Sequence, residues 1–393
     1  MATDRTAYLA LASLATPGNR ELGNLIRSTG PALALDRLLH GSDLSPELTE
    51  AVNARLSAAG RASARVDRIA DGMLRRAEQL GARIVTPADE EWPASLHDLT
   101  QISSHDDNPI RRDTDPPLCL WLRGPQRLDV TLQRSVSVVG ARAATGYGAS
   151  VASEFAYGLA ERGWTVVSGG ALGIDVTAHR GALAARGSTV AVLACGIDRA
   201  YPAANAAVLE QIGAEGLLVT EWPPGTQPQK AQFLARNRII AATTRGTVMV
   251  EAGSRSGARN TLACARLLQR AAMVVPGPTT SAMSVGCHIE LRQPDTVLVT
   301  RVEEIIEEIG SVNQPAPTGH RPYEVLDALQ ARILDAVQPH RATRAEQIAA
   351  AAGVSDRDAR RTLPLLADLG LVIAGPNGYR RAGEPPAVHR ERG

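Results

Sequence analysis

The residues best suited to chemistry lie in two glycine-rich turns, each directly after a short apolar run. The runs are SVSVV at 135–139 and TVVS at 165–168, and both turns lead into helix-length segments. Glycine permits a tight turn and lets backbone amides approach an anion at a helix start, while arginine adds a charged donor. We therefore expect the two turns to lie side by side and to bind phosphate. The residues predicted to do so are Gly140, Arg142, Ser168, Gly169, Gly170 and Gly173.

A third segment, PPGTQPQKAQFLARNRIIA at 223–241, combines positive charge with an aromatic ring. Three cations there can pair with phosphates and one phenyl ring can stack on a base, the combination that single-strand binding proteins use. The alternative is a solvent-exposed loop followed by an ordinary helix start. The residues concerned are Lys230, Phe233, Arg236, Asn237 and Arg238, of which Lys230 is the only lysine and Phe233 one of two phenylalanines in the chain.

A fourth turn, in VEAGSRSGARNTLACA at 250–265, follows another apolar run and opens another helix. The amides around Ser256 and Gly257 suit a phosphate or a ribose. A tight strand-to-helix turn needs glycine for structural reasons alone, so one such turn is weak evidence. The recurrence of the pattern, with an arginine in one turn, favours an anion site.

Catalytic chemistry has little support in the sequence. Asp175 and His179 stand at i,i+4 helical spacing, which could orient a general base. We favour a structural interpretation, in which Asp175 stabilises a helix start and His179 packs nearby. The sequence shows no nucleophile elbow, Walker lysine or paired metal carboxylates. The four cysteines lack metal-ligand spacing, so we predict no catalytic residue, no metal and no cofactor.

The turns need a scaffold, and from Ser135 onward apolar runs alternate with helix-length segments. The later runs are TVAVLA, GLLVT, TVMV, AMVV and TVLV. Strands separated by helices predict a parallel sheet covered on both faces, with the turns gathered at its carboxyl edge. We therefore predict an α/β fold with an extended Rossmann-like central domain and a parallel-rich sheet.

The amino-terminal region predicts a helical domain. Its first sixty residues contain short helical segments separated by turns, which we interpret as a helical cap in preference to a DNA-binding helix-hairpin-helix. A helix at 65–80 and a strand at 83–85 follow. The polar segment 101–117 predicts a surface loop or a disordered insertion.

The carboxyl-terminal region predicts a winged helix. Helices at 330–337, at 344–351 and from a Ser355 cap to Leu369 precede a hairpin with an Asn377-Gly378 turn. The predicted domains are helical at 1–62, extended Rossmann-like at 63–311 and winged-helix at 323–382, with a proline-rich linker at 312–322 and a tail at 383–393.

Composition limits the range of partners. A chain of 393 residues is too long for one compact core and indicates two or three domains. Its net charge is +1, so a nucleic-acid site must be a local concentration of positive charge. The start of the chain lacks a signal pattern and no apolar run reaches membrane-spanning length. We expect a cytoplasmic protein without a membrane partner.

Taken together, the motifs resemble those of the DNA-processing protein A (DprA/Smf) family. Its signatures occur in order between Ser135 and Leu291: VGAR with YG, SGGALGID, VLACGIDRAYPAAN, EWPPGTQPQ, FLARNRIIA, EAGSRSGA, VVPGP and SVGCHIE. The resemblance implies the three-part fold above, single-stranded DNA binding, homodimers, and loading of the RecA recombinase in natural transformation. By motif, it assigns Arg142 to a phosphate turn, Gly169, Gly170 and Gly173 to its neighbour, and Lys230, Phe233, Arg236 and Asn237 to the DNA-binding pocket.

Two positions depart from the family pattern. Ala141 stands where serine is common, which removes one hydroxyl donor to phosphate. His288 stands where asparagine is common. We expect these departures to affect affinity more than the fold.

Two other functions stay open. Related Rossmann-like domains cleave the glycosidic bond of nucleoside monophosphates, and EAGSRSGARNTL is loosely similar to their glycine-rich motif. Their catalytic glutamate lies on the following helix, whereas residues 260–269 contain no acid. The third possibility is a transcription regulator whose winged helix acts on DNA while the central domain senses a nucleotide.

Overall fold

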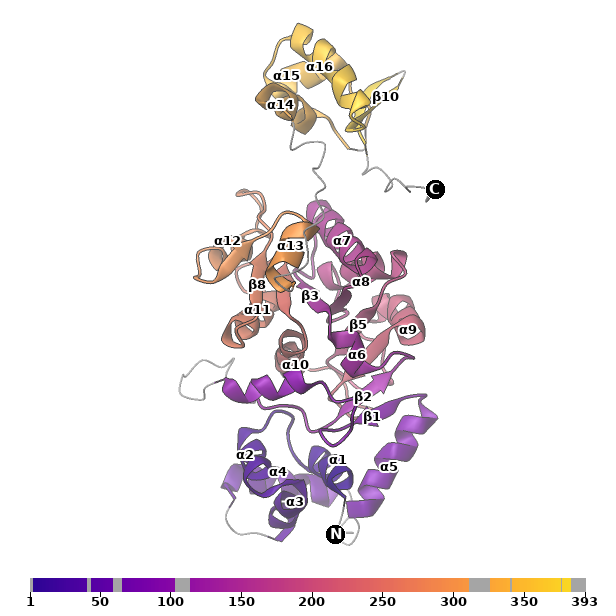
Figure 1. The fold of residues 1–393 in the computed structure, drawn as a ribbon, viewed down its shortest axis with the longest axis vertical. Coiled ribbons are helices and arrows are strands. Elements are labelled where there is room, and N and C mark those ends of the chain that lie inside the picture. The colour runs from indigo at the N-terminus through magenta and orange to yellow at the C-terminus, as the bar shows by residue number, and fades with distance from the viewer. Residues whose placement is uncertain are drawn as a thin grey trace. The chain divides into compact units, whose positions relative to one another are not determined.

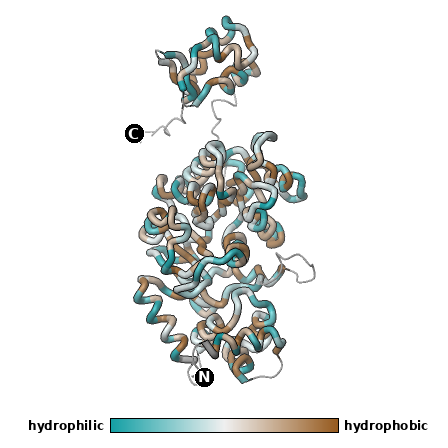
Figure 2. The backbone as a smooth tube through the Cα atoms, turned by 180° about the vertical axis from the view of Figure 1, so that it is seen from behind, coloured by the Kyte–Doolittle hydropathy of each residue, from teal (hydrophilic) through white to brown (hydrophobic). Residues whose placement is uncertain are grey.

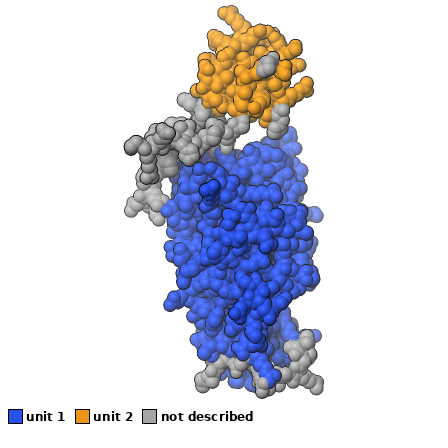
Figure 3. Space-filling view, turned by 90° about the vertical axis from the view of Figure 1, so that its right-hand side faces the viewer, with its two compact units in different colours: residues 1–314 blue, residues 315–393 orange. Residues whose placement is uncertain are grey.

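The computed structural model describes residues 3–40, 44–58, 66–102, 114–310, 326–339, 341–375 and 377–382. They fall into two compact units, one within residues 1–314 and one within residues 315–393, which Figure 3 colours separately. The predicted linker at 312–322 and tail at 383–393 lie outside the described residues.

A bundle of short helices begins the first unit, as the sequence predicts. Asn19 caps the second of these helices, because its side chain accepts a hydrogen bond from the Leu22 amide at 2.8 Å. The bundle encloses an apolar core of its own that includes Leu11, Leu22 and Leu35. The helices are α1 (Asp4–Leu14), α2 (Arg20–Thr29), α3 (Pro31–His40) and α4 (Pro46–Ala58), followed by α5 (Val66–Gln79).

A nine-stranded sheet forms the centre of the first unit (Figure 1). Its strands are β1 (Arg83–Val85), β2 (Leu120–Arg123), β3 (Ser135–Val139), β4 (Thr165–Ser168), β5 (Thr189–Leu193), β6 (Leu217–Thr220), β7 (Gly246–Met249), β8 (Ala271–Val274) and β9 (Thr296–Leu298). The order is β1-β2-β6-β5-β4-β3-β7-β8-β9. From β5 to β9 this is the Rossmann order 3-2-1-4-5-6, with all neighbours parallel. Strand β6 pairs parallel with β5, β2 pairs antiparallel with β6, and β1 pairs antiparallel with β2.

Helices cover both faces of the sheet, so its central strands are buried on both sides. Along β3, Val136 and Val138 join one core while Val139 joins the other, as the two-residue side-chain period of a strand requires. The first core includes α7 (Gly146–Glu161), α8 (Ile174–Ala184) and α13 (Val302–Ile309), and the second includes α6 (Leu128–Leu132), α10 (Lys230–Ala242), α11 (Gly257–Leu267) and the 3-10 helix η1 (Ala94–Gln101). The remaining elements are η3 (Ala203–Asn205), α9 (Ala206–Glu215) and α12 (Val285–Glu290).

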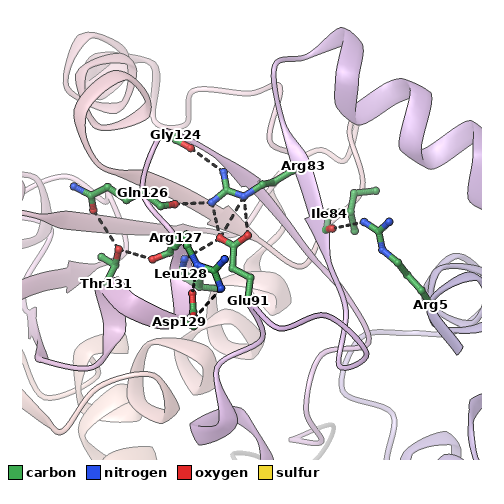
Figure 4. Close-up of polar contacts among 10 residues, drawn as sticks. All are labelled: Arg5, Arg83, Ile84, Glu91, Gly124, Gln126, Arg127, Leu128, Asp129 and Thr131. Atoms are coloured by element: carbon green, nitrogen blue, oxygen red, sulfur yellow. Dashed lines mark hydrogen bonds and ion pairs between the residues drawn. The ribbon is translucent and has the colours of Figure 1, made fainter.

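An ion-paired network fixes the antiparallel edge of the sheet (Figure 4). Arg83 on β1 donates to the Glu91 carboxylate at 2.6 and 3.0 Å, and the same carboxylate accepts from the Leu128 amide at 2.8 Å. From α1, Arg5 donates to the Ile84 carbonyl at 3.0 Å. The edge is therefore tied both to the helical bundle and to the start of α6.

The expectation of a surface loop at 101–117 is wrong at its carboxyl end. Thr114 and Asp115 are each 2% exposed, whereas residues 103–113 lie outside the described residues. Arg27 on α2 donates to the Asp115 carboxylate at 2.8 Å, and Arg20 donates to the Thr114 hydroxyl at 2.9 Å. Arginines from a distant helix bond to the Thr114 hydroxyl and to one carboxylate oxygen of Asp115, which offsets the cost of burial and which the local composition does not reveal.

The second unit has the predicted helices and hairpin of a winged helix. Its elements are α14 (Ala328–Ala336), α15 (Ala345–Ala352), α16 (Asp356–Asp368), β10 (Val372–Gly375) and β11 (Gly378–Arg381). Gly353 ends α15 at φ 62°, and the Ser355 side chain caps α16. The predicted Asn377-Gly378 turn is displaced by one residue, because Gly378 already pairs with Gly375 across the hairpin.

Within the described residues, no helix is long and apolar enough to cross a membrane. Figure 2 shows hydrophilic and hydrophobic stretches interleaved along the chain. The same residues contain no cluster of three or more histidine, cysteine, aspartate or glutamate side chains that could hold a metal ion. All four cysteines are buried and unpaired, and burial raises the pKa of both the Cys264 and Cys287 thiols to about 11.

Candidate nucleic-acid interface

A cavity of about 890 Å³ opens at the carboxyl ends of β3 and β7. These neighbouring strands form the topological switch point of the sheet, because the order runs from β3 to β4 on one side and from β7 to β8 on the other. Helix α10 contributes to the lining. Eight of the residues proposed from sequence line this cavity: Gly140, Arg142, Lys230, Phe233, Arg236, Asn237, Ser256 and Gly257. Their contact with DNA stays a prediction.

The residues of the second glycine turn that the sequence suggested as phosphate contacts lie outside this lining, although Ala171 and Asp175 of the same turn belong to it. Ser168 is buried, and its hydroxyl donates to the Val138 carbonyl at 2.7 Å. At Gly173, which has φ 78°, a Cβ atom would lie 2.2 Å from the Ala141 carbonyl oxygen. The turn, which also contains Gly169 and Gly170, therefore packs against the first turn and supports it.

A buried carboxylate accepts hydrogen bonds from backbone amides of both turns. Asp175 accepts hydrogen bonds from the amides of Gly140, Gly169 and Ala171, of which the Gly169 bond is 3.1 Å. Burial raises the pKa of the Asp175 carboxyl, while nearby Arg236 and the three amides oppose that rise. The expected phosphate cradle is thus filled by an acidic side chain of the protein itself.

A second carboxylate occupies the start of α7. Glu251, which follows β7, accepts from the Thr145 amide at 2.9 Å and from the Thr145 hydroxyl at 2.6 Å. Thr145 is the cap residue of α7, so Glu251 sits where the helix dipole favours an anion. Other donors around the cavity include side chains at its opening and the start of α11, which the Ser256 side chain caps at the Ala258 amide.

The Asp175 and His179 pair has the structural role that the sequence favoured. His179 is buried, and its Nδ1 lies 2.7 Å from the Thr189 hydroxyl. That hydroxyl donates to the Val166 carbonyl, so Nδ1 must be the protonated ring nitrogen that donates to it. Burial lowers the pKa of His179 to about 3. His179 is therefore a poor base, and it does not line the cavity.

Arg236 and Asn237 hold the floor of the cavity together. Both are buried, and Arg236 donates to the carbonyls of Gly169, at 2.8 Å, and Val192. The Asn237 side-chain amide donates to the Gly257 carbonyl at 3.2 Å. Burial lowers the pKa of Arg236 to about 10, so it stays charged at neutral pH. Through these hydrogen bonds the two side chains connect the second turn, β5 and the start of α11.

Arg238 does not line the cavity. The prediction that this segment offers three cations to phosphate is therefore wrong for Arg238. Its guanidinium is buried and donates twice to the Glu221 carboxylate, each time at 2.8 Å. Its Nε donates to the Asp115 carbonyl at 3.1 Å. Two positions along a helix correspond to about 200° of rotation, which directs Arg238 away from the face that carries Arg236.

The opening of the cavity carries exposed cations and two aromatic rings in tilted contact. The Arg142 guanidinium lies over the Phe233 ring, 4.9 Å from its centroid. Tyr201 packs on the same ring, with centroids 5.8 Å apart and planes at 47°, and is 43% exposed. Lys230 and Arg255 are also exposed there. Sequence reasoning missed Tyr201, although a tyrosine in the motif GIDRAYPAAN of an aromatic-poor chain was a usable signal.

Local sequence explains how α10 presents its cation. Gln229 and Gln232 form a reciprocal capping box, so the helix begins at Lys230. A cation at a helix start is unfavourable for the helix dipole. The only lysine in the chain therefore stands where helix stability disfavours it and where a bound anion would benefit.

The two departures from the family pattern lie in different places. Ala141 lines the cavity, where serine would have offered a hydroxyl. The His288 side chain is outside the lining, and its Nε2 lies 2.9 Å from the Gly277 carbonyl. Only the first departure bears directly on the contents of the cavity.

Fold and site together define a class: an α/β protein with Rossmann topology whose switch-point cavity combines cations with aromatic rings. Residues 83–310 match the family of DNA recombination-mediator protein A. The chain belongs to this family, and the resemblance seen in its motifs is confirmed.

Relatives agree in sequence and in structure. The putative DNA processing protein DprA of Mycobacterium tuberculosis is 41% identical over 390 residues, covering 97% of this chain and 96% of that protein. The DNA processing protein DprA of Streptococcus pneumoniae is 39% identical over 196 residues, covering 49% of this chain and 67% of that protein. The X-ray structure of DNA processing protein A from S. pneumoniae has a TM-score of 0.59 at 30% identity, covering 79% of this chain and 99% of that one.

Proposed function

We propose that this protein binds single-stranded DNA in the switch-point cavity and mediates recombination without catalysing a reaction. The observation that carries the proposal is the group formed by Arg142, Phe233 and Tyr201 at the cavity opening, with Lys230 on the same rim. Cations beside stackable rings fit a chain of phosphates and bases. Membership of a DNA recombination-mediator family supports the same function.

Single strands suit this cavity better than duplexes do. A base must leave its stack to reach a half-buried ring such as Phe233, and unstacking and unpairing a duplex base costs a few kcal/mol. With phosphates neutralised at the rim, affinity should fall steeply with salt, with a log–log slope of about −0.7 per contact.

We further propose that the bound strand is handed to the RecA recombinase, that the protein acts as a homodimer, and that it works in the cytoplasm. The support is the family relationship, which joins this chain to DNA processing proteins. A nucleotide-cleaving enzyme is less well supported. Glu251 is engaged with Thr145, and α11 contains no acidic residue.

Electrophoretic shifts with oligo-dT and with a duplex of equal length test the proposal, each with and without RecA. The expected result is a shift of the single strand at protein concentrations that leave the duplex free, and faster RecA filament formation on coated strands. Equal affinity for both forms of DNA would contradict single-strand binding. Release of free base from a nucleoside monophosphate would favour the enzyme instead.

A further inference from the structure

The side-chain amide of Asn260 on α11 has an orientation that its neighbours dictate. Arg236 donates through Nε to the Oδ1 of Asn237 at 3.3 Å. The other side of that amide, Nδ2, therefore donates to the Gly257 carbonyl and to Asn260, both at 3.2 Å. A guanidinium can only donate and a carbonyl can only accept, so the atom of Asn260 that faces Asn237 must be its oxygen.

This orientation leaves the Nδ2 of Asn260 as a hydrogen-bond donor at the cavity. Asn260 lines the cavity and is half-buried. Within the described part of the chain, Asn237 donates to Asn260 Oδ1, and Asn260 Nδ2 makes no hydrogen bond. A polar group in such a place gains from meeting an acceptor on a ligand.

The exposed cations of the cavity lie at its opening, whereas the charged groups of its floor, Asp175 and Arg236, are bonded to the protein backbone. Buried side chains of Val139, Ile240 and Ala258 form its inner wall, whereas Arg142 and Lys230 at its rim are exposed. A nucleotide has the same division, since its base is flat and weakly polar while its phosphate is anionic. The cations therefore match the phosphates at the opening, and the inner wall matches an inserted base.

From these observations we infer that Asn260 reads the inserted base by donating its Nδ2 hydrogen to a base carbonyl oxygen. The inference rests on the proposed function and adds a contact to the base edge, distinct from the phosphate contacts at the rim. Such a contact would give the site a modest preference among bases. One neutral hydrogen bond corresponds to about two- to tenfold in affinity.

The test compares thymine with 2,4-difluorotoluene, a nonpolar ring of the same shape that stacks but hardly accepts hydrogen bonds. Fluorescence anisotropy would give the affinity of the protein for strands of each kind. We expect wild-type protein to prefer the thymine strand, and Asn260→Ala to lose about two- to tenfold of that preference. Asn260→Asp should lose it as well, while keeping an oxygen toward Asn237 and so preserving the frame.

The rim supplies a matched control in Arg255, an exposed cation that lines the same cavity. Arg255→Gln should weaken both strands equally and leave the preference intact. Melting temperatures of all variants would verify folding, and a folded Asn260→Asp keeps the test decisive if Asn260→Ala unfolds.

Three outcomes would overturn the inference. Unchanged affinity for both strands in both Asn260 variants would show that the amide does not contact the ligand. Equal loss on thymine and difluorotoluene strands would assign Asn260 to phosphate. Failure of the wild-type protein to bind either strand would remove the proposed function, and this inference with it, which distinguishes that failure from the first two.

Discussion

Arg142 and Phe233 touch in the structure, so their contributions to DNA binding should be coupled. From the sequence, one supplies charge and the other a stacking surface, and their effects would add. In the structure the guanidinium lies 4.9 Å from the ring centroid, so the ring holds the arginine in place before DNA arrives. Without the ring, binding must order a flexible side chain, at about 0.5–1.5 kcal/mol.

A double-mutant cycle measures this coupling. Arg142→Ala should weaken binding and make the salt slope shallower by about 0.7. Phe233→Ala should cost roughly 1–3 kcal/mol, the usual range for base–aromatic stacking, with a nearly unchanged slope. The double variant should lose less than the sum of the two, by about 0.5–1.5 kcal/mol. Anisotropy titrations of labelled oligo-dT at several salt concentrations provide both affinity and slope.

The matched control is a second cycle that pairs Arg255 with Phe233. Arg255 also lines the cavity, but it is Arg142 whose guanidinium lies over the Phe233 ring. Arg255→Ala and Phe233→Ala should be additive. Strict additivity in the Arg142 cycle as well would refute the reasoning. Melting curves test whether Phe233 instead belongs to the core. Truncating a core phenylalanine would lower the stability of the protein by roughly 3–5 kcal/mol. A Phe233→Ala variant that melts early yet binds normally would show that Phe233 is a core residue.

Three further predictions concern stability and domain roles. Arg238→Met should lower the free energy of unfolding by about 3–5 kcal/mol in urea titrations, because it strands the buried Glu221 carboxylate; a change below about 1 kcal/mol would contradict that pairing. The pKa of His179 is lowered to about 3, against about 6.5 in the unfolded chain. Stability is therefore fully present above pH 6.5 and falls as the pH drops toward 3, by about 1.4 kcal/mol per pH unit; His179→Gln should flatten urea-derived stability between pH 7 and pH 5. Removing residues 321–393 should leave single-strand affinity within about tenfold, or roughly 1.4 kcal/mol, and a larger loss in shift assays would give the second unit a part in binding.

The scaffold was readable from the sequence because strong local signals specify it. Each apolar run became a strand, and each glycine-rich turn fell at the carboxyl edge of the parallel sheet, since strands and turns depend on residues close in the chain. The cavity residues on α10 and α11 could be found in the same way, because both helices begin near that edge of the sheet. Even the cap at Ser355 was visible, because a cap depends on three adjacent positions.

Long-range partners were beyond sequence reasoning. Local sequence does not indicate that Asp175 and Glu251 fill amides expected to meet phosphate, because the amides of Gly140 and Thr145 that they bind are far away in the chain. Arg238 looked equivalent to Arg236 until Glu221 and Asp115 were placed around it. Tyr201 precedes η3 whereas Phe233 lies on α10, so their contact could not be seen without the fold. These pairings are tertiary, and hydrogen-bonding groups become specific only once their partners are known.

The central claim is tested most directly at Lys230, because it is the only lysine in the chain and lies on the cavity rim. An amine-reactive acetylating reagent would modify Lys230 and the amino terminus, and mass spectrometry would follow each separately. We predict that saturating oligo-dT slows modification of Lys230 several-fold while the amino terminus reacts as before, and that a duplex at equal concentration has little effect. Equal reaction of Lys230 with and without the bound single strand would contradict binding in this cavity.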